Sequence, residues 1–287
     1  MSLIKLMRPH QWVKNGFVLT GLLFGHAWTE PALVQAALFA LVAFCLASSS
    51  VYVFNDLFDR EQDQLHPVKC RRPLASGAVT PNQGWMLTIG LALAALIIAR
   101  MASPLVVTYV LAYLLLNVVY TLRLKHIVIL DIFCISAGFM LRILAGTDGI
   151  EIPPSNWLVV CGLWTTLFLG FIKRRAEIFT LAEEGGEHRA VLNDYSPTLL
   201  DKLIGITCTG MILSYSLYTM DENIMLFHGT ERLYYTVPFV MYACFRYLFL
   251  LHDSSGGGDP SRDLFRDPHI ALAGLGWLIT VLSLVAL

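Results

Sequence analysis

Long apolar stretches recur along the whole chain and constrain its fold more than any other feature. A helix needs about 20 mainly apolar residues to cross a bilayer. Such runs occupy nine regions, near residues 15–29, 33–56, 82–99, 103–122, 127–146, 156–174, 200–220, 233–251 and 269–287. Charged residues make up only 14% of the 287 residues, against about 25% in soluble domains. The sequence therefore predicts an all-α integral membrane protein with nine transmembrane helices and a single domain over residues 1–287.

The Lys and Arg residues lie almost entirely on one side of this predicted topology. If the N-terminus is cytoplasmic, all but Arg100, Arg142 and Arg232 of the 20 Lys and Arg residues fall in cytoplasmic segments or beside them. This distribution follows the positive-inside rule. The long connections also fall on the cytoplasmic side, whereas a transporter needs access from both faces. We therefore expect a polar pocket that opens to the cytoplasm.

A cluster of carboxylates follows the second apolar run. The motif "NDLFDREQD", Asn55 to Asp63, comes directly after a stretch with no charged residue. On a continuous α-helix with about 100° per residue, Asp56 and Asp63 nearly eclipse and Asp59 lies about 60° away. Carboxylates at this depth need a counter-cation, and oxygen ligands suit Mg²⁺. The pattern predicts a Mg²⁺ site; the alternative is a helix end that is simply solvated.

Cationic residues lie close to these carboxylates in the sequence. Lys69 and Arg72 belong to "HPVKCRRPLASG", and Lys14 belongs to "RPHQWVKN" near the N-terminus. Arg side chains bind phosphate oxygens in a forked geometry, so these cations beside a Mg²⁺ site suggest a substrate that bears phosphate. The alternative is ordinary anchoring at the cytoplasmic interface, and Trp12 in the same N-terminal motif fits an interfacial aromatic belt.

The later cytoplasmic segments add further candidates. Lys125 follows the fourth apolar run and Asp131 lies within the fifth, and "KRRAE" places Lys173 four residues before Glu177. Each has a plain alternative, because Lys125 could extend to the interface and an i, i+4 pair is usually a helix-surface contact. The chain contains no Ser/His/Asp or Cys/His nucleophile set, no glycine-rich nucleotide loop and no basic–aromatic surface for nucleic acid.

Together these motifs resemble those of the UbiA-type intramembrane prenyltransferases. "NDLFDREQD" fits the NDxxDxxxD pattern of that superfamily. The opening "RPHQWVKN" and "KRRAE" are similar to a subgroup that transfers the phosphoribosyl group of phosphoribosyl pyrophosphate to a polyprenyl phosphate and releases pyrophosphate. The resemblance runs nearly end to end. It implies a bundle of nine helices, an enzyme dependent on Mg²⁺, and a location in the bacterial inner membrane with a cytoplasmic active site.

The resemblance also implies roles for individual residues. Asn55, Asp56, Asp59 and Asp63 would hold Mg²⁺ and the donor pyrophosphate, and the three aspartates would be catalytic. The expected substrate-binding residues are Lys14, Asn55, Lys69, Arg72, Tyr120, Lys125, Asp131, Lys173, Arg174, Glu177 and Tyr195.

Two positions depart from the family patterns. Cys70 stands where the subgroup usually has a basic residue, and Ile135 stands where aromatic prenyltransferases have the second aspartate of a DxxxD pair that would begin at Asp131. A site with one carboxylate fewer repels phosphate less, so the missing aspartate favours substrates that carry more phosphate groups. Phosphoribosyl transfer uses such substrates. The alternative function is transfer of a prenyl group from a prenyl diphosphate to an aromatic or other acceptor.

Overall fold

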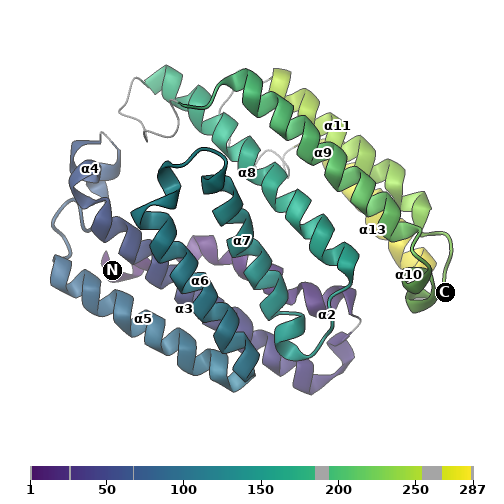
Figure 1. Ribbon diagram of the computed structural model, residues 1–287, viewed down its shortest axis with the longest axis horizontal. Coiled ribbons are helices and arrows are strands. Elements are labelled where there is room, and N and C mark those ends of the chain that lie inside the picture. Colours follow the sequence, from purple (N-terminus) through teal and green to yellow (C-terminus); the bar gives the residue numbers. More distant parts are fainter. Residues whose placement is uncertain (1, 26, 67, 185–193, 254–266, 286–287) are drawn as a thin grey trace. The chain divides into compact units, whose positions relative to one another are not determined.

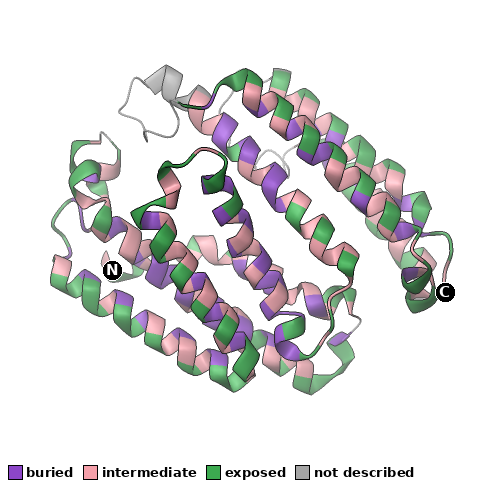
Figure 2. Cartoon of the chain, in the orientation of Figure 1, coloured by how far each residue is buried: buried purple, intermediate pink, exposed green. Residues whose placement is uncertain are grey.

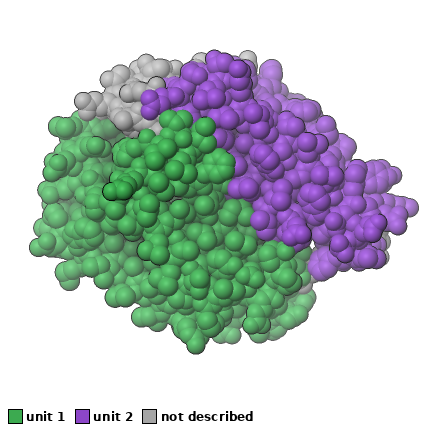
Figure 3. All heavy atoms as spheres, viewed as in Figure 1, with its two compact units in different colours: residues 1–154 green, residues 155–287 purple. Residues whose placement is uncertain are grey.

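The computed structural model describes residues 2–25, 27–66, 68–184, 194–253 and 267–285, and all regular structure in these ranges is helical (Figure 1). The chain divides into two compact units, residues 1–154 and residues 155–287 (Figure 3). The prediction of a single integral membrane domain over 1–287 stays a prediction.

The first unit contains the N-terminal segments and the helices that carry the carboxylate motif. Its α-helices are α1 (Ser2–Met7), α2 (Thr20–Phe24), α3 (Pro31–Phe58), α4 (Arg60–Leu65), α5 (Pro81–Ala102), α6 (Pro104–Leu122) and α7 (Leu130–Ala145). Its 3-10 helices are η1 (Pro9–Leu19), η2 (Ala27–Thr29), η3 (Lys69–Arg71), η4 (Leu124–His126) and η5 (Asp148–Ile150). Helix α3 packs against α5, and both η1 and α6 also contact it.

The second unit is built from two pairs of packed helices. Its elements are α8 (Asn156–Glu184), α9 (Pro197–Thr219), α10 (Glu222–His228), η7 (Leu233–Thr236), α11 (Val237–Asp253) and α13 (Pro268–Val285). Helix α8 packs on α9, and α11 packs on α13.

Local sequence explains where the long helices begin. Proline occupies the first turn of α3, α5, α6 and α9, where its missing N–H is not needed and its fixed φ suits a helix. Thr80 and Gln83 form a capping box at the start of α5. Ser103 and Ser196 cap α6 and α9 with their hydroxyls. These caps satisfy N–H groups that have no partner within the helix.

The core of the first unit is made by small residues on α3. Ala40, Ala43 and Ala47 are buried there, three or four residues apart, next to Phe44 and against side chains that include Val110 of α6. Residues at this spacing share one helix face, and alanines on that face let neighbouring helices approach closely. Many large apolar side chains elsewhere are exposed, and Figure 2 shows exposed positions along many of the helices. Such a surface suits a lipid environment.

The described helices confirm the all-α architecture. Six of them are long and apolar enough to cross a membrane, or seven if the bent pair of α9 and α10 forms one span. These helices match the predicted spans from 33–56 through 233–251. Residues 15–29 form no single long helix, contrary to expectation, because the chain there runs through η1, α2 and η2. The predicted count of nine spans is therefore not confirmed by helix length alone.

Candidate active site

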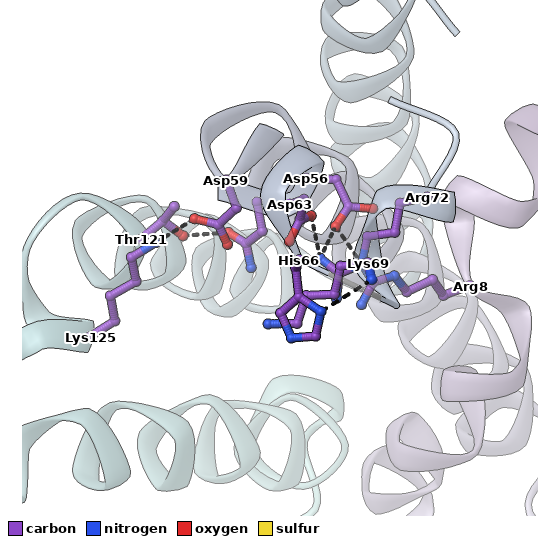
Figure 4. A network of polar contacts seen from close by, with 10 residues as sticks. Arg8, Asp56, Asp59, Asp63, His66, Lys69, Arg72, Thr121 and Lys125 are labelled. Carbon is purple, nitrogen blue, oxygen red and sulfur yellow. Dashed lines mark hydrogen bonds and ion pairs between the residues drawn. The ribbon is translucent and has the colours of Figure 1, made fainter. Parts of the chain in front are cut away.

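The predicted carboxylate motif spans a break between two helices. Helix α3 ends at Phe58, Asp59 caps it with a non-helical backbone conformation (φ −86°, ψ 4°), and α4 begins at Arg60. Asp56 thus lies in the last turn of α3, and Asp63 lies in α4 (Figure 4). Our expectation of one continuous helix through the motif is wrong at Asp59. Asp56 and Asp63 still converge, as expected, on Arg72, whereas Asp59 contacts a different partner.

Asp56 and Asp63 converge on a single nitrogen of Arg72. The Nη1 atom of Arg72 lies 3.1 Å from Oδ1 of Asp56 and 2.7 Å from Oδ2 of Asp63. Arg8 adds a second guanidinium, with Nη2 at 2.5 Å from Oδ1 of Asp56 (Figure 4). Both carboxylates are almost fully buried, with 3% and 4% of their surface exposed. Buried charges persist when they are paired and hydrogen-bonded in this way.

A second contact set joins the carboxylate motif to the end of α6. Nζ of Lys125, in η4, lies 2.7 Å from Oδ1 of Asp59. The hydroxyl of Thr121, in the last turn of α6, donates a hydrogen bond to Oδ1 of Asn55. Sequence reasoning selected Lys125 separately from the motif that holds Asn55 and Asp59, and the structure joins Lys125 to Asp59 (Figure 4).

The loop before Arg72 is organised by His66. Its Nδ1 accepts hydrogen bonds from the main-chain N–H groups of Val68 and Lys69, at 3.2 and 3.4 Å. The main-chain N–H of Arg72 then donates to the carbonyl of Lys69 at 2.9 Å. These bonds turn the chain through η3, so that the guanidinium of Arg72 reaches back to the carboxylates.

The donor set fits a hard divalent cation held jointly with a ligand. Because one nitrogen of Arg72 contacts both Asp56 and Asp63, the two carboxylates already converge on a single cationic centre. Within the described residues, no group of three His, Cys, Asp or Glu side chains could hold a metal ion. Mg²⁺ is usually bound by one or two carboxylates together with phosphate oxygens and water, and the pair of Asp56 and Asp63 meets that pattern.

The remaining predicted residues of the first unit are Lys14, Lys69, Tyr120 and Asp131. Asp131 is fully buried in the first turn of α7. Tyr120 precedes Thr121 at the end of α6, and Lys14 lies in η1; both are partly exposed. The main chain of Lys69 contacts His66, as described above. Their roles in substrate binding stay predictions.

Four predicted residues belong to the second unit. Glu177 of α8 accepts a hydrogen bond from Nη1 of Arg174, and its Oε1 lies 3.9 Å from Nζ of Lys173. Arg174 is buried, whereas the side chain of Lys173 is largely exposed. Tyr195, just before α9, is also buried. The predicted i, i+4 pair therefore exists, but the closer partner of Glu177 is Arg174.

Sequence reasoning did not select Arg8 or Thr121. Arg8 stood in a quoted motif, yet nothing local distinguishes it from other cations at the cytoplasmic interface. Its contact with Asp56 joins residues 48 positions apart. Thr121 is a polar residue at the end of an apolar run, and its position beside Lys125 was the available signal.

Comparison with known proteins defines the class. The sequence model of the UbiA prenyltransferase family matches residues 16–265 of the chain. The chain therefore belongs to the UbiA prenyltransferase family, as its motifs indicated, and with its long apolar helices it is an integral membrane protein.

Within this class, the chain is similar along nearly its whole length to enzymes of one kind. It is 31% identical to the decaprenyl-phosphate phosphoribosyltransferase of Mycolicibacterium smegmatis over 292 residues, which cover 98% of this chain and 91% of the relative. It is also 31% identical to the enzyme of the same name from Mycobacterium tuberculosis over 291 residues, covering 99% and 94% of the two chains.

Solved structures confirm the fold. A UbiA homolog from Archaeoglobus fulgidus, bound to DMAPP and Mg²⁺, superposes with a TM-score of 0.73 at 16% identity, and the match covers 100% of both chains. The apo structure of a UbiA homolog from Aeropyrum pernix gives a TM-score of 0.66 at 12% identity, covering 93% of this chain and 97% of that one. At these identities the likeness concerns the fold alone.

Proposed function

We propose that this protein is a polyprenyl-phosphate phosphoribosyltransferase. It transfers the 5-phosphoribosyl group of phosphoribosyl pyrophosphate to a polyprenyl phosphate, releases pyrophosphate, and depends on Mg²⁺. One geometric observation carries the proposal: two buried carboxylates meet at a single cationic centre, with a second arginine and a lysine beside them. This is the donor set expected for a metal-bound diphosphate. The choice of donor is supported by the near full-length similarity to decaprenyl-phosphate phosphoribosyltransferases.

We assign the metal to Asp56 and Asp63, with Asn55 and Asp59 next to them. When bound, Mg²⁺ supplies charge neutralisation to the leaving pyrophosphate. Arg72 contacts both carboxylates, so its remaining N–H groups are close to a diphosphate held there and are suited to donate to phosphate oxygens. Preorganised donors of this kind stabilise charge that develops in a transition state.

The reaction needs no strong general base from the chain. The bond that breaks joins the ribose anomeric carbon to the pyrophosphate oxygen, and the bond that forms joins the same carbon to an oxygen of the lipid phosphate. That oxygen is already anionic, so no proton has to be removed before attack. We keep Lys173, Arg174, Glu177 and Tyr195 as proposed contacts for the acceptor or for the 5-phosphate, together with Lys14, Lys69, Tyr120, Lys125 and Asp131.

We further propose nine membrane crossings with a cytoplasmic site in the bacterial inner membrane. A 3-10 helix rises about 2.0 Å per residue, so the 11 residues of η1 and the 5 residues of α2 extend roughly 30 Å, the thickness of the hydrocarbon core. Helix α13, with 18 residues, measures about 27 Å at 1.5 Å per residue. These two elements would complete the predicted nine. Reporter fusions that place residue 190 and residue 228 on the same side of the membrane would exclude this topology.

The alternative is prenyl transfer from a prenyl diphosphate, which would use the same carboxylates. It is favoured by the fold neighbour from Archaeoglobus fulgidus, whose structure contains DMAPP and Mg²⁺. Ile135 in place of a second aspartate speaks against an aromatic acceptor.

Turnover by purified protein in detergent tests the proposal. The protein is incubated with Mg²⁺ and either phosphoribosyl pyrophosphate or a prenyl diphosphate as donor, each with a polyprenyl phosphate or an aromatic acid as acceptor, and the product is identified by mass spectrometry. We expect a phosphoribosylated lipid, and none from the Asp63→Asn variant. Efficient prenyl transfer to an aromatic acid, without phosphoribosyl transfer, would select the alternative.

A further inference from the structure

Arg142 is a buried cation in the apolar part of α7. It is 6% exposed, and all three of its side-chain nitrogens are hydrogen-bonded. Nε donates to Oδ1 of Asn15 at 2.7 Å, Nη1 to the carbonyl of Gly138 at 2.7 Å, and Nη2 to the hydroxyl of Tyr113 at 3.0 Å. The guanidinium also lies over the rings of Tyr113 and Phe139. These partners, all within the described residues, are neutral, so Arg142 is not part of an ion pair. Its hydrogen bonds connect α7 to Tyr113 of α6 and to Asn15 of η1, and we call this set of hydrogen bonds the joint.

The element that Arg142 holds is unusual. Helix η1 is a 3-10 helix of 11 residues, although such helices rarely exceed 3–4 residues because their hydrogen-bond geometry is poorer. Tertiary contacts must therefore stabilise it. Residues three apart share one face of a 3-10 helix. On that face, Nε1 of Trp12 donates to Oγ of Ser49 at 2.9 Å and Nδ2 of Asn15 donates to Oγ of Ser48 at 3.2 Å.

Both ends of η1 are held at the same turn of α3. Oγ of Ser49 donates to the carbonyl of Met7 at 2.8 Å, directly before Arg8, and Asn15 is bonded to the neighbouring Ser48. From Ser49 to Asp56 there are seven steps of about 1.5 Å, or roughly 10 Å. The side chain of Arg8 covers this distance along α3, and its Nη2 lies 2.5 Å from Oδ1 of Asp56.

The backbone at Arg8 indicates that this placement is imposed by its surroundings. Arg8 precedes η1 with φ 50° and ψ 58°, in the left-handed region. For a residue other than glycine this conformation is strained and persists only when the surrounding structure determines it. The guanidinium of Arg8 also lies over the ring of Tyr52, at 5.2 Å from its centroid. Contacts along η1 therefore support the conformation of a residue at its start.

We propose that Arg142 is a positioning residue that acts through Asn15: it helps to hold η1 against α3 and so keeps Arg8 on Asp56 as a counter-cation that a divalent metal must displace. The inference rests on the proposed function, in that it takes Asp56 and Asp63 as metal ligands. It assigns no contact between Arg142 and substrate.

The consequence is a change in metal affinity that does not require turnover. In the protein without substrate, Arg8 and a metal ion compete for the same oxygen of Asp56. Removing Arg8 therefore strengthens metal binding, by about tenfold if one charge-assisted hydrogen bond is lost as a competitor. Removing the hydrogen bonds of Asn15 loosens the placement of Arg8 on Asp56. We expect this change also to strengthen metal binding, by severalfold.

Direct titration of Mn²⁺ tests this. The substrate-free protein in detergent is titrated, and free Mn²⁺ is measured by electron paramagnetic resonance. We expect Arg8→Ala to bind Mn²⁺ about tenfold more tightly than the wild type, and Asn15→Leu to do so severalfold. In the double variant, the loss of Asn15 is expected to add nothing, because the joint acts only through Arg8.

Two further variants separate positioning from general destabilisation. Val110→Ala creates a cavity in the same core but removes no hydrogen bond of η1, and it is expected to lower thermal stability while leaving Mn²⁺ affinity unchanged. Arg142→Lys keeps the buried charge but loses the forked geometry, so it provides a second way to cut the joint if Asn15→Leu does not fold. We expect it to tighten Mn²⁺ binding as Asn15→Leu does.

Three results would overturn the inference, and they differ from one another. Wild-type Mn²⁺ affinity in both Asn15→Leu and Arg142→Lys would show that the hydrogen bonds of Arg142 serve packing only and do not position Arg8. Unchanged or weaker binding by Arg8→Ala would remove its role as a competitor. Wild-type binding by an Asp56→Asn/Asp63→Asn double variant would place the metal elsewhere, and only that result would also contradict the metal site of the proposed function.

Discussion

The substitution Asp56→Asn removes one negative charge and leaves the size of the side chain unchanged. In the structure, Oδ1 of Asp56 accepts hydrogen bonds from Arg8 at 2.5 Å and from Arg72 at 3.1 Å. An asparagine oxygen can still accept a hydrogen bond, but it carries no charge to balance the two guanidinium groups. Without metal, we therefore expect Asp56→Asn to lower the stability of the protein.

The size of the loss follows from the burial of the partners. Removing one member of a buried ion pair costs about 3–5 kcal/mol. The side chains of Arg8 and Arg72 are 25% and 29% exposed, so both can partly rehydrate, and Arg72 keeps its contact with Asp63. These two facts reduce the expected loss to about 2 kcal/mol. For a protein of this size, that corresponds to a fall of roughly 4–8 °C in Tm.

Thermal unfolding in detergent with EDTA measures this effect. The matched control is Asp148→Asn, which changes an exposed carboxylate whose Oδ2 accepts from the hydroxyl of Tyr109; surface changes of this kind usually stay within about 0.5 kcal/mol. Adding Mg²⁺ to 100 times its dissociation constant stabilises a binding protein by about 2.7 kcal/mol. We expect that gain in the wild type and little of it in Asp56→Asn.

An increase in Tm for metal-free Asp56→Asn would refute the reasoning. It would mean that repulsion among the carboxylates exceeds their attraction to Arg8 and Arg72, and that the arginines do not hold the positions described. An equal fall in Asp56→Asn and Asp148→Asn would show that the assay does not report on the buried network.

Three other predictions concern separate parts of the molecule. Gly146→Ala would place a Cβ atom 1.6 Å from the carbonyl oxygen of Val18, so we expect poor yield of folded protein, whereas Gly90→Ala has no atom within 4 Å and is expected to be neutral or slightly stabilising. The hydrogen bond from Arg246 lowers the pKa of Asp267, against the opposing effect of burial. The ionised carboxylate of Asp267 therefore stabilises the fold above the ordinary pKa of about 3.9, and this stabilisation is lost as the pH falls through the lowered pKa. The unfolding curves of the wild type and Asp267→Asn should converge at that low pH. Lys173→Ala is expected to raise the KM for one substrate roughly tenfold or more, if its ammonium binds phosphate, with little change for the other; equal changes would contradict that role.

The helices were largely predictable because their signals are local. Each long apolar run carries its own length and polarity, and prolines such as Pro31, Pro81 and Pro104 mark where helices begin. The exception is η1. The predicted apolar run 15–29 overlaps only its second half. Its 3-10 conformation depends on contacts with α3 and α7, and no local property of residues 9–19 encodes those contacts.

The site was predictable in composition but not in geometry. The motif from Asn55 to Asp63 identified the carboxylates, and the nearby Arg72 follows from sequence distance. The break at Asp59 was not predictable, because a helix continuing through this polar segment is equally compatible with its sequence. Trp12 was assigned to the interface by residue type alone and Arg8 was not selected, whereas the structure joins Arg8 to Asp56 and Trp12 to Ser49 through contacts that span 48 and 37 positions.

The balance of charge at the α3–α4 junction has a consequence for the order of binding. The carboxylates Asp56, Asp59 and Asp63 are met by three cationic side chains, Arg8, Arg72 and Lys125, so the network is close to neutral by itself. A divalent cation alone would leave excess positive charge in a partly buried place, and a diphosphate alone would leave excess negative charge. Only the two together restore the balance, because the metal takes the carboxylates while the displaced guanidinium groups meet the phosphate oxygens. Metal and diphosphate are therefore expected to raise each other's affinity by the same factor, as linkage requires.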